Sequence, residues 1–168
     1  MNIPVNILFN PKLNARRKAG TLTIADHVLI GTAVFLAGLF PASKVAIGNR
    51  TSGVHPPEIG VNLYDQSNSK KSTDTAEFTF GIEITYIPED SADRAEINHA
   101  IFLILQGFDV IQSDVGTFRC RDKASDITDG LGHVTGNVAV RAVTMPTDSD
   151  GLIITQDEII NKIKGVVI

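Results

Sequence analysis

The stretch from Thr75 to Phe108 constrains the fold most strongly, because its apolar residues change from one period to another. In the first half they occupy every second position, which puts them on one face only in an extended strand. In the second half the spacing becomes three and four residues, as in a helix packed against a flat surface. The strand positions are Phe78, Phe80, Ile82, Ile84 and Tyr86, and the helix positions are Ile97, Ala100, Ile101, Ile104, Leu105 and Phe108. We therefore expect a long strand, a turn in which Asp90 or Ser91 caps the helix, and an amphipathic helix lying on that strand.

The composition fits one domain with its own core, because the chain has 168 residues of which 43% are apolar. The net charge of −4 argues against a dedicated nucleic-acid binder, which needs clustered Lys and Arg to neutralise phosphates. It does not argue against a channel wall past which DNA slides. The single cysteine, Cys120, excludes an internal disulfide and every multi-cysteine metal motif, and its alternating surroundings predict that it is buried.

An apolar run from Val28 to Phe40 has only thirteen residues, too few for a bilayer span of about 20, and the acidic Asp26 before it argues against a secretion signal. Thr23 and Asp26 instead form a capping-box pattern that predicts a helix ending before Pro41. One stripe of this helix suits a sheet. Its other face is also apolar, so we expect part of it to contact another subunit. The stripe comprises Ile24, Val28, Phe35 and Leu39, and the other face Leu29, Ile30, Ala33, Leu36 and Ala37.

The N-terminal residues 1–21 contain two prolines and no clear period, which predicts an arm outside the core. The arm has a short apolar segment followed by a basic one. Apolar arms usually dock on a neighbouring subunit or on their own domain, and a disordered tail is the alternative. The apolar segment is Ile7, Leu8 and Phe9, and the basic segment is Arg16, Arg17 and Lys18.

The remaining patterns predict short strands at 44–48 and 58–65, a loop at 49–57, and strands at 116–122 and 133–145 with a bulge at Gly136 or Arg141. The stretch 66–74 has no apolar residue, so we expect a long mobile hairpin loop there. Together the elements predict an α+β domain at 22–146, a mostly antiparallel sheet with two helices packed on one face. The N-terminal arm precedes it, and residues 147–168 form a linker and a short C-terminal helix.

No strong catalytic or phosphate-binding motif is present, and no cofactor or metal is expected. Glu96 and His99 lie three residues apart on the predicted helix, which is more typical of a solvated pair than of metal ligands. The basic features with a defined geometry are Lys70 with Lys71 on the polar hairpin, and Arg119 with Arg121 on one strand face. An enzyme with dispersed residues stays open as an alternative.

The order and phase of elements between residues 22 and 143 resemble those of bacteriophage tail terminator (tail completion) proteins. The resemblance rests on a helix ending in Leu-Phe-Pro, the segment Lys-Val-Ala-Ile, a Pro-Pro-Glu-Ile-Gly-Val strand, and the Phe-Thr-Phe-Gly-Ile-Glu-Ile-Thr-Tyr-Ile-Pro-Glu-Asp unit before the central helix. It implies a non-enzymatic α+β protein of the virion neck, assembled in the host cytoplasm. Such proteins form a hexameric ring on the tail tube, end its polymerisation and face the head connector or stopper protein, while DNA passes through the lumen without specific binding. No membrane partner is implied.

Two sets of residues become candidate contacts under this hypothesis. The subunit or ring contacts are Ile7, Leu8, Phe9, Arg16, Arg17, Lys70 and Lys71, and the lumen or partner contacts are Arg119 and Arg121. Another phage neck, connector or tube protein is the nearest alternative. A small-molecule-binding module or a hydrolase with a dispersed site is the alternative from a different class.

Overall fold

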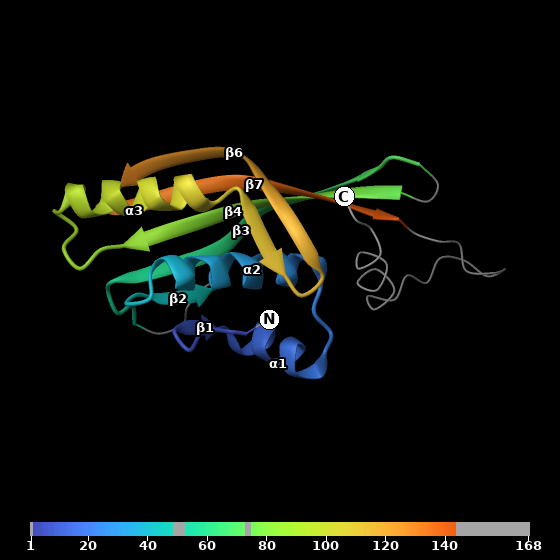
Figure 1. The fold of residues 1–168 in the computed structure, drawn as a ribbon, viewed down its shortest axis with the longest axis horizontal. Coiled ribbons are helices and arrows are strands. Elements are labelled where there is room, and N and C mark those ends of the chain that lie inside the picture. Colours follow the sequence, from blue (N-terminus) through green and yellow to red (C-terminus); the bar gives the residue numbers. More distant parts are fainter. Residues whose placement is uncertain (1, 49–52, 73–74, 144–168) are drawn as a thin grey trace.

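The structure is a computed structural model that describes residues 2–48, 53–72 and 75–143 (Figure 1). This part of the chain is an α+β domain with three helices and one seven-stranded sheet, which confirms the predicted fold class. The elements are β1 (Ile7–Phe9), α1 (Pro11–Ala19), α2 (Ile24–Leu39), β2 (Lys44–Ile47), β3 (Glu58–Lys70), β4 (Thr75–Ile87), α3 (Arg94–Gly107), β5 (Val110–Ser113), β6 (Gly116–Thr128) and β7 (Leu131–Val143).

The strands lie in the order β1-β2-β3-β4-β7-β6-β5. The β1–β2 and β2–β3 pairs are parallel and all others are antiparallel. The central strand β4 pairs with β3 on one side and with β7 on the other along nearly its whole length. The stretch that dominates the sequence pattern is therefore also the centre of the sheet.

The predicted strand and helix at 75–108 are confirmed as β4 and α3. Ile82 and Ile84 are fully buried, as are Ile97 and Ile104 on the helix that packs on their face. The cap differs from the prediction. Asp93 accepts hydrogen bonds from the backbone N–H groups of Ala95 and Glu96, both at 3.0 Å, whereas Asp90 accepts from Ala92 in the preceding turn. The helix starts later than expected because residues 88–92 form this extra turn.

Helix α2 begins at the predicted capping box of Thr23 and Asp26 and is covered on more than one side. It packs on β2 and β3, and the β5–β6 hairpin crosses it (Figure 1). At the crossing, a Cβ atom on Gly31 would lie 2.7 Å from the backbone oxygen of Gln112. The second apolar face, expected to meet another subunit, is therefore largely buried within the chain, at Ile30, Ala33, Leu36 and Ala37.

The N-terminal segment is part of the domain. Ile7 pairs with Val45 in the parallel β1–β2 ladder, and both Ile7 and Leu13 belong to the hydrophobic core. The expectation of an arm outside the core is therefore wrong for the segment that carries β1 and α1. A three-residue strand is too short to show a period, and its parallel partner lies far along the chain, so no local pattern indicates this pairing.

Residues 66–70, predicted to belong to a long loop, are strand instead, because β3 continues to Lys70 and pairs with β4 as far as Ala76. The β6–β7 hairpin likewise extends through residues 125–128, and the register shift lies in β6 between Arg121 and Ala124 instead of in β7. Hydrogen-bonded strand pairs form between polar segments as well as between apolar ones, so the absence of apolar residues at 66–70 did not indicate a loop. The predicted C-terminal helix lies outside the described residues.

Candidate assembly surfaces

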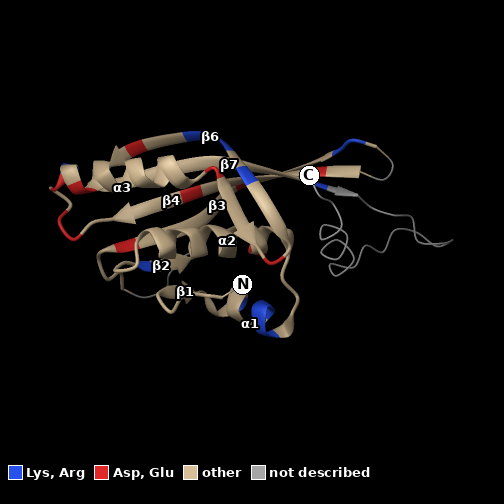
Figure 2. Ribbon diagram, in the orientation of Figure 1, with Lys and Arg blue, Asp and Glu red and all other residues tan. Residues whose placement is uncertain are grey.

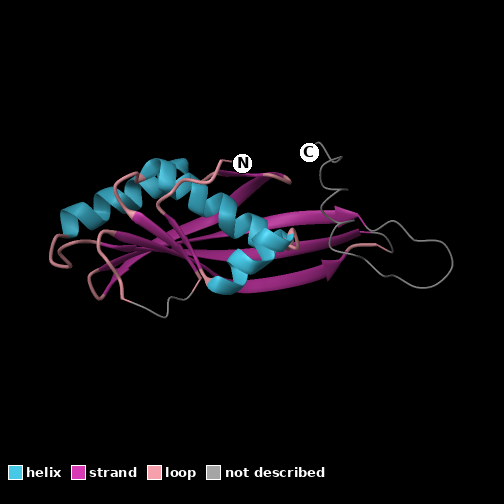
Figure 3. Cartoon of the chain, turned by 90° about the horizontal axis from the view of Figure 1, so that it is seen from below, coloured by secondary structure: helices cyan, strands magenta, loops and turns pink. Residues whose placement is uncertain are grey.

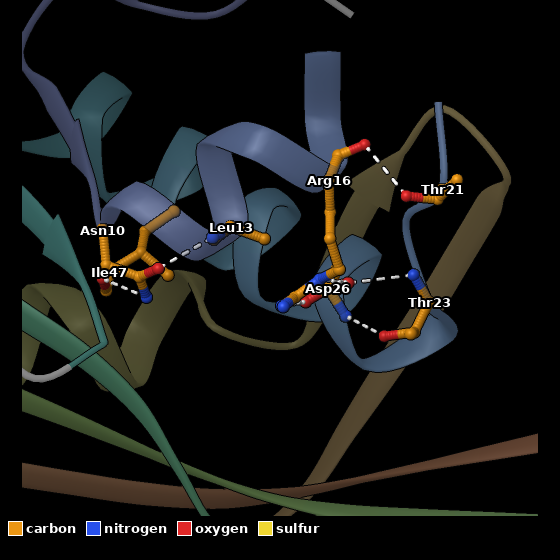
Figure 4. A network of polar contacts seen from close by, with 7 residues as sticks. All are labelled: Asn10, Leu13, Arg16, Thr21, Thr23, Asp26 and Ile47. Atoms are coloured by element: carbon orange, nitrogen blue, oxygen red, sulfur yellow. Dashed lines mark hydrogen bonds and ion pairs between the residues drawn. The ribbon is translucent and has the colours of Figure 1, made fainter. Parts of the chain in front are cut away.

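Helix α1 is held to α2 by an ion pair between the partly exposed Arg16 and the buried Asp26 (Figure 4). Arg16 donates from Nε to Oδ2 at 2.9 Å and from its terminal nitrogen to Oδ1 at 2.6 Å. Oδ2 also accepts from the backbone N–H of Thr23 at 2.9 Å. Burial raises the pKa of Asp26, but the bonds from Arg16 and Thr23 outweigh it and hold that pKa below its usual value. Arg16, predicted to contact another subunit, thus has an intrachain partner.

The junction between β1 and α1 is fixed by Asn10 (Figure 4). Its side-chain oxygen accepts from the backbone N–H of Leu13 at 2.8 Å, and its amide nitrogen donates to the carbonyl of Ile47 at 3.4 Å. The guanidinium of Arg17 lies 4.8 Å from the ring centroid of Phe9, a cation–π contact. Of the predicted contact residues of this segment, Phe9 and Arg17 therefore contact each other, and Leu8 and Phe9 are half-buried.

The solvent side of α1 is basic. Lys12, Arg17 and Lys18 are exposed, and α1 contains no acidic residue (Figure 2). We refer to these three side chains as the basic surface of α1. The Arg16–Asp26 pair fixes the position of α1 on the domain. The three positive charges therefore lie at a defined place on the protein surface.

The ends of β3, β4 and β7 form a ribbon that continues past the helices (Figures 1 and 3). We call residues 66–72, 75–79 and 139–143 the protruding ribbon. Glu77 joins its strands, because Lys71 lies 3.2 Å and Arg141 lies 3.1 Å from its carboxylate oxygens. Hydrogen bonds from Arg141 and Lys71 lower the pKa of Glu77. Lys70 is exposed on the same ribbon, so only Lys71 of the predicted lysine pair has this intrachain contact.

Arg119 and Arg121 are both exposed on β6 and lie on the side opposite to the buried Cys120, as strand alternation requires. Arg121 is in register with Asn137 of β7, whereas Arg119 is in register with Val110 of β5. The two arginines therefore share a face of β6 but border different neighbouring strands.

Tyr64 crosses the polar face of the sheet and was not singled out from the sequence. Its hydroxyl donates to the side-chain oxygen of Asn137 at 3.2 Å, and a Cβ on Gly81 would lie 2.6 Å from its ring. Tyr64 is 55% exposed, so a partner could contact it. The only sequence signal is Gly81 in the middle of a strand, which often marks a close approach of another group.

The candidate reactive groups are dispersed. Glu96 accepts a hydrogen bond from the hydroxyl of Tyr86 at 2.5 Å, and burial together with Glu96 raises the pKa of Tyr86. His133 lies 3.4 Å from a carboxylate oxygen of Glu83. Within the described ranges no group of three His, Cys, Asp or Glu side chains could hold a metal ion. Burial raises the pKa of the Cys120 thiol to about 11.

Within those same ranges no single helix is long and apolar enough to cross a membrane. Helices α1 and α2 reach that length and composition only when taken together, and they are bent by 109° at the break between them. Both contribute buried residues to the domain core.

The fold and these surfaces define a class: an α+β protein whose prominent features are a fixed basic helix and a protruding ribbon. Compared with models of protein families, residues 28–150 match the phage tail terminator protein family. Because the match covers most of the chain, the protein belongs to that family. No match to a curated protein was found. Membership confirms the resemblance and gives the chain a structural role as a component of the phage tail.

Proposed function

We propose that six copies of this protein form a ring at the head-proximal end of the tail tube, in the virion neck. The ring ends polymerisation of the tube protein and joins the tail to the head connector or stopper protein. The observation that carries this proposal is the family match over residues 28–150. In this proposal the ring assembles in the host cytoplasm.

The surfaces suit such a subunit. The protruding ribbon extends beyond the body and carries Lys70, so it is the natural contact with an adjoining ring (Figure 1). Leu8, Phe9 and Arg17 are the residues of the N-terminal segment that we assign to the neighbouring subunit, while Ile7 and Arg16 hold that segment in place. This assignment keeps the predicted contact set but divides it into outward and inward members.

The charge suits a channel through which DNA passes without being gripped. The chain carries a net charge of −4, so it would repel DNA at distances where screening is incomplete. Arg119 and Arg121 are both exposed on β6, the first in register with Val110 and the second with Asn137, and we assign them to the lumen or to a partner. Two arginines per subunit would give local contacts with phosphate but not a continuous basic track.

The first experiment measures the mass of the purified protein by native mass spectrometry and sedimentation, alone and with tail-tube protein. The expected result is a closed ring, either alone or on tube ends, and tubes that stop growing when the protein is added. A tube subunit would instead polymerise into long tubes by itself. A protein that stays monomeric and leaves tube growth unchanged would overturn the proposal.

A second experiment tests the ribbon with Lys70→Glu, using Lys44→Glu as a matched charge reversal at another exposed lysine. Lys70→Glu should still form rings, because the ribbon meets the next ring and not the neighbouring subunit, but it should fail to stop tube growth. Equal activity of both variants in the tube assay would exclude Lys70 from the contact.

A further inference from the structure

Two turns that are distant in the sequence meet at one end of the molecule. A Cβ atom on Gly130, in the β6–β7 turn, would lie 2.8 Å from the backbone oxygen of Ser91, in the turn before α3. Gly130 has φ +73°, so a side chain there would be strained as well as crowded. The tertiary fold thus brings the acidic residues of both turns to one place.

The side chains gathered there are mainly carboxylates. Glu89, Asp90 and Asp93 come from the turn before α3 and Asp129 comes from the β6–β7 turn, and all four are exposed. Figure 2 shows acidic residues along this end of α3 and its preceding turn. Arg94 is the basic residue beside them. We call these four carboxylates the acidic end.

The acidic end retains capacity to bind a partner. The backbone N–H bonds of the α3 start use one oxygen, Oδ1, of Asp90 and of Asp93. A carboxylate accepts several hydrogen bonds, so the second oxygen of each stays available. These residues therefore shape the turn and still present negative charge to solvent.

The opposite charge is concentrated on α1. The first twenty residues contain Lys12, Arg16, Arg17 and Lys18 but no acidic residue, so the rest of the chain carries the whole acidic excess. Arg16 is already paired with Asp26, which leaves the basic surface of α1 for a partner. Figure 2 shows α1 as a basic element well separated from the acidic end.

We propose that the basic surface of α1 in one copy binds the acidic end of the next copy. The inference rests on the proposed ring and specifies one of its subunit contacts. Because the two surfaces are different parts of the same chain, their contact is head-to-tail, and repetition of such a contact closes a ring when the rotation allows. Complementary charge steers the copies together and fixes their orientation.

DNA fits the basic surface of α1 less well than a second copy does. Three exposed cations on a two-turn helix neutralise few phosphates, and the acidic remainder of the chain repels a polyanion. A second copy offers the four exposed carboxylates of the acidic end in one place.

The direct test is carbodiimide coupling of assembled rings, formed with tube protein if needed, from a mixture of isotopically labelled and unlabelled chains. Carbodiimide joins an amine to a carboxylate only where they are in contact. Links between Lys12 or Lys18 of one isotope and Glu89, Asp90, Asp93 or Asp129 of the other are expected. Rings that yield no such link would overturn the contact and leave the proposed ring intact.

The matching variants are Lys12→Glu with Lys18→Glu on the basic surface, and Glu89→Lys with Asp129→Asn on the acidic end. Asn is chosen because residue 129 has φ 53°, which Asn tolerates well. Each pair should raise the concentration needed for assembly by roughly tenfold or more, the change that loss of a few exposed ion pairs gives. Salt should weaken assembly of the unaltered protein by screening the same contact.

Lys44→Glu is the control for altered net charge and should assemble normally. The thermal unfolding midpoint shows whether each variant folds, and Lys12→Gln with Lys18→Gln replaces the reversed pair if that pair unfolds. Unchanged assembly of folded variants on both surfaces would overturn the inference but not the proposed function. An unaltered protein that forms no ring, even with tube protein, overturns both.

Discussion

The guanidinium of Arg16 binds both carboxylate oxygens of Asp26, the same residue that completes the capping box of α2. One buried carboxylate therefore fixes the start of α2 and the position of α1. The basic surface proposed for subunit contact depends on this pair, because α1 has only one fully buried side chain, Leu13.

Replacing Arg16 with Met should lower the free energy of unfolding by about 2 kcal/mol, because the Asp26 carboxylate would stay buried without its main partner. This loss is smaller than the loss expected when a fully buried ion pair is broken, because the Arg16 side chain is 43% exposed. Urea unfolding followed by circular dichroism measures it. Arg17→Met is the matched control and should cost about 0.5 kcal/mol, since it removes an exposed cation–π contact. Equal losses of unfolding free energy in the two variants would show that the Arg16–Asp26 ion pair stabilises the fold no more than the exposed contact of Arg17 does.

The same pair predicts how stability depends on pH. The folded-state pKa of Asp26 lies below its usual value of about 4, so the folded protein favours the charged form. Its contribution is therefore complete above the unfolded pKa and is lost as the pH falls through the folded pKa. The stability gap between the unaltered protein and Asp26→Asn should be constant between about pH 5 and 7 and shrink below about pH 4. A gap that widens in acid would contradict the assignment.

Gly31→Ala should destabilise the domain by about 2 kcal/mol, because its Cβ would meet backbone at the crossing of α2 and β5. The nearest atoms, the Gln112 oxygen and Ile111 Cγ2, are both 2.7 Å away. Gly38→Ala, on the same helix, has no neighbour within 4 Å and should stabilise the helix by about 0.5–1 kcal/mol. The thermal unfolding midpoint should fall for Gly31→Ala and rise for Gly38→Ala. A higher midpoint for Gly31→Ala would mean that β5 does not pack closely on α2.

Leu13→Ala should lower the free energy of unfolding by about 2–5 kcal/mol, the usual range for truncation of a buried leucine. Leu13 is 1% exposed and joins α1 to the core. Leu8→Ala, at a half-buried position in β1, should cost clearly less. Chemical denaturation of the two variants compares them directly. Similar small losses would mean that α1 does not pack on the domain as described.

Local patterns predicted most elements because the information needed for them lies within a few residues. Alternation at Ile82 and Ile84 defined a strand, the three-and-four spacing from Ile97 defined a helix, and Thr23 with Asp26 defined a helix start. The family could also be inferred from the sequence, since the order and phase of these elements resemble those of tail terminators.

Patterns failed where the partner was distant or where polar backbone formed a ladder. The pairing of Ile7 with Val45 joins a short strand to one far along the chain, so nothing local predicts it. The polar residues 66–70 form strand because β4 supplies their hydrogen bonds. Of the candidate contacts, Arg16 has an intrachain partner that its spacing does not reveal, and Tyr64 was missed.

The fold class, the central strand and helix, the capping of α2 and the family can be inferred from the sequence, because periodicity and capping are properties of neighbouring residues. Which apolar faces are buried within the chain, and which charged residues lie close together, depends on the packing of the whole domain. The coverage of α2 by β5 and the meeting of the turns at Gly130 and Ser91 depend on contacts between segments far apart in the chain. Such contacts result from packing the whole domain, so they have no local signature.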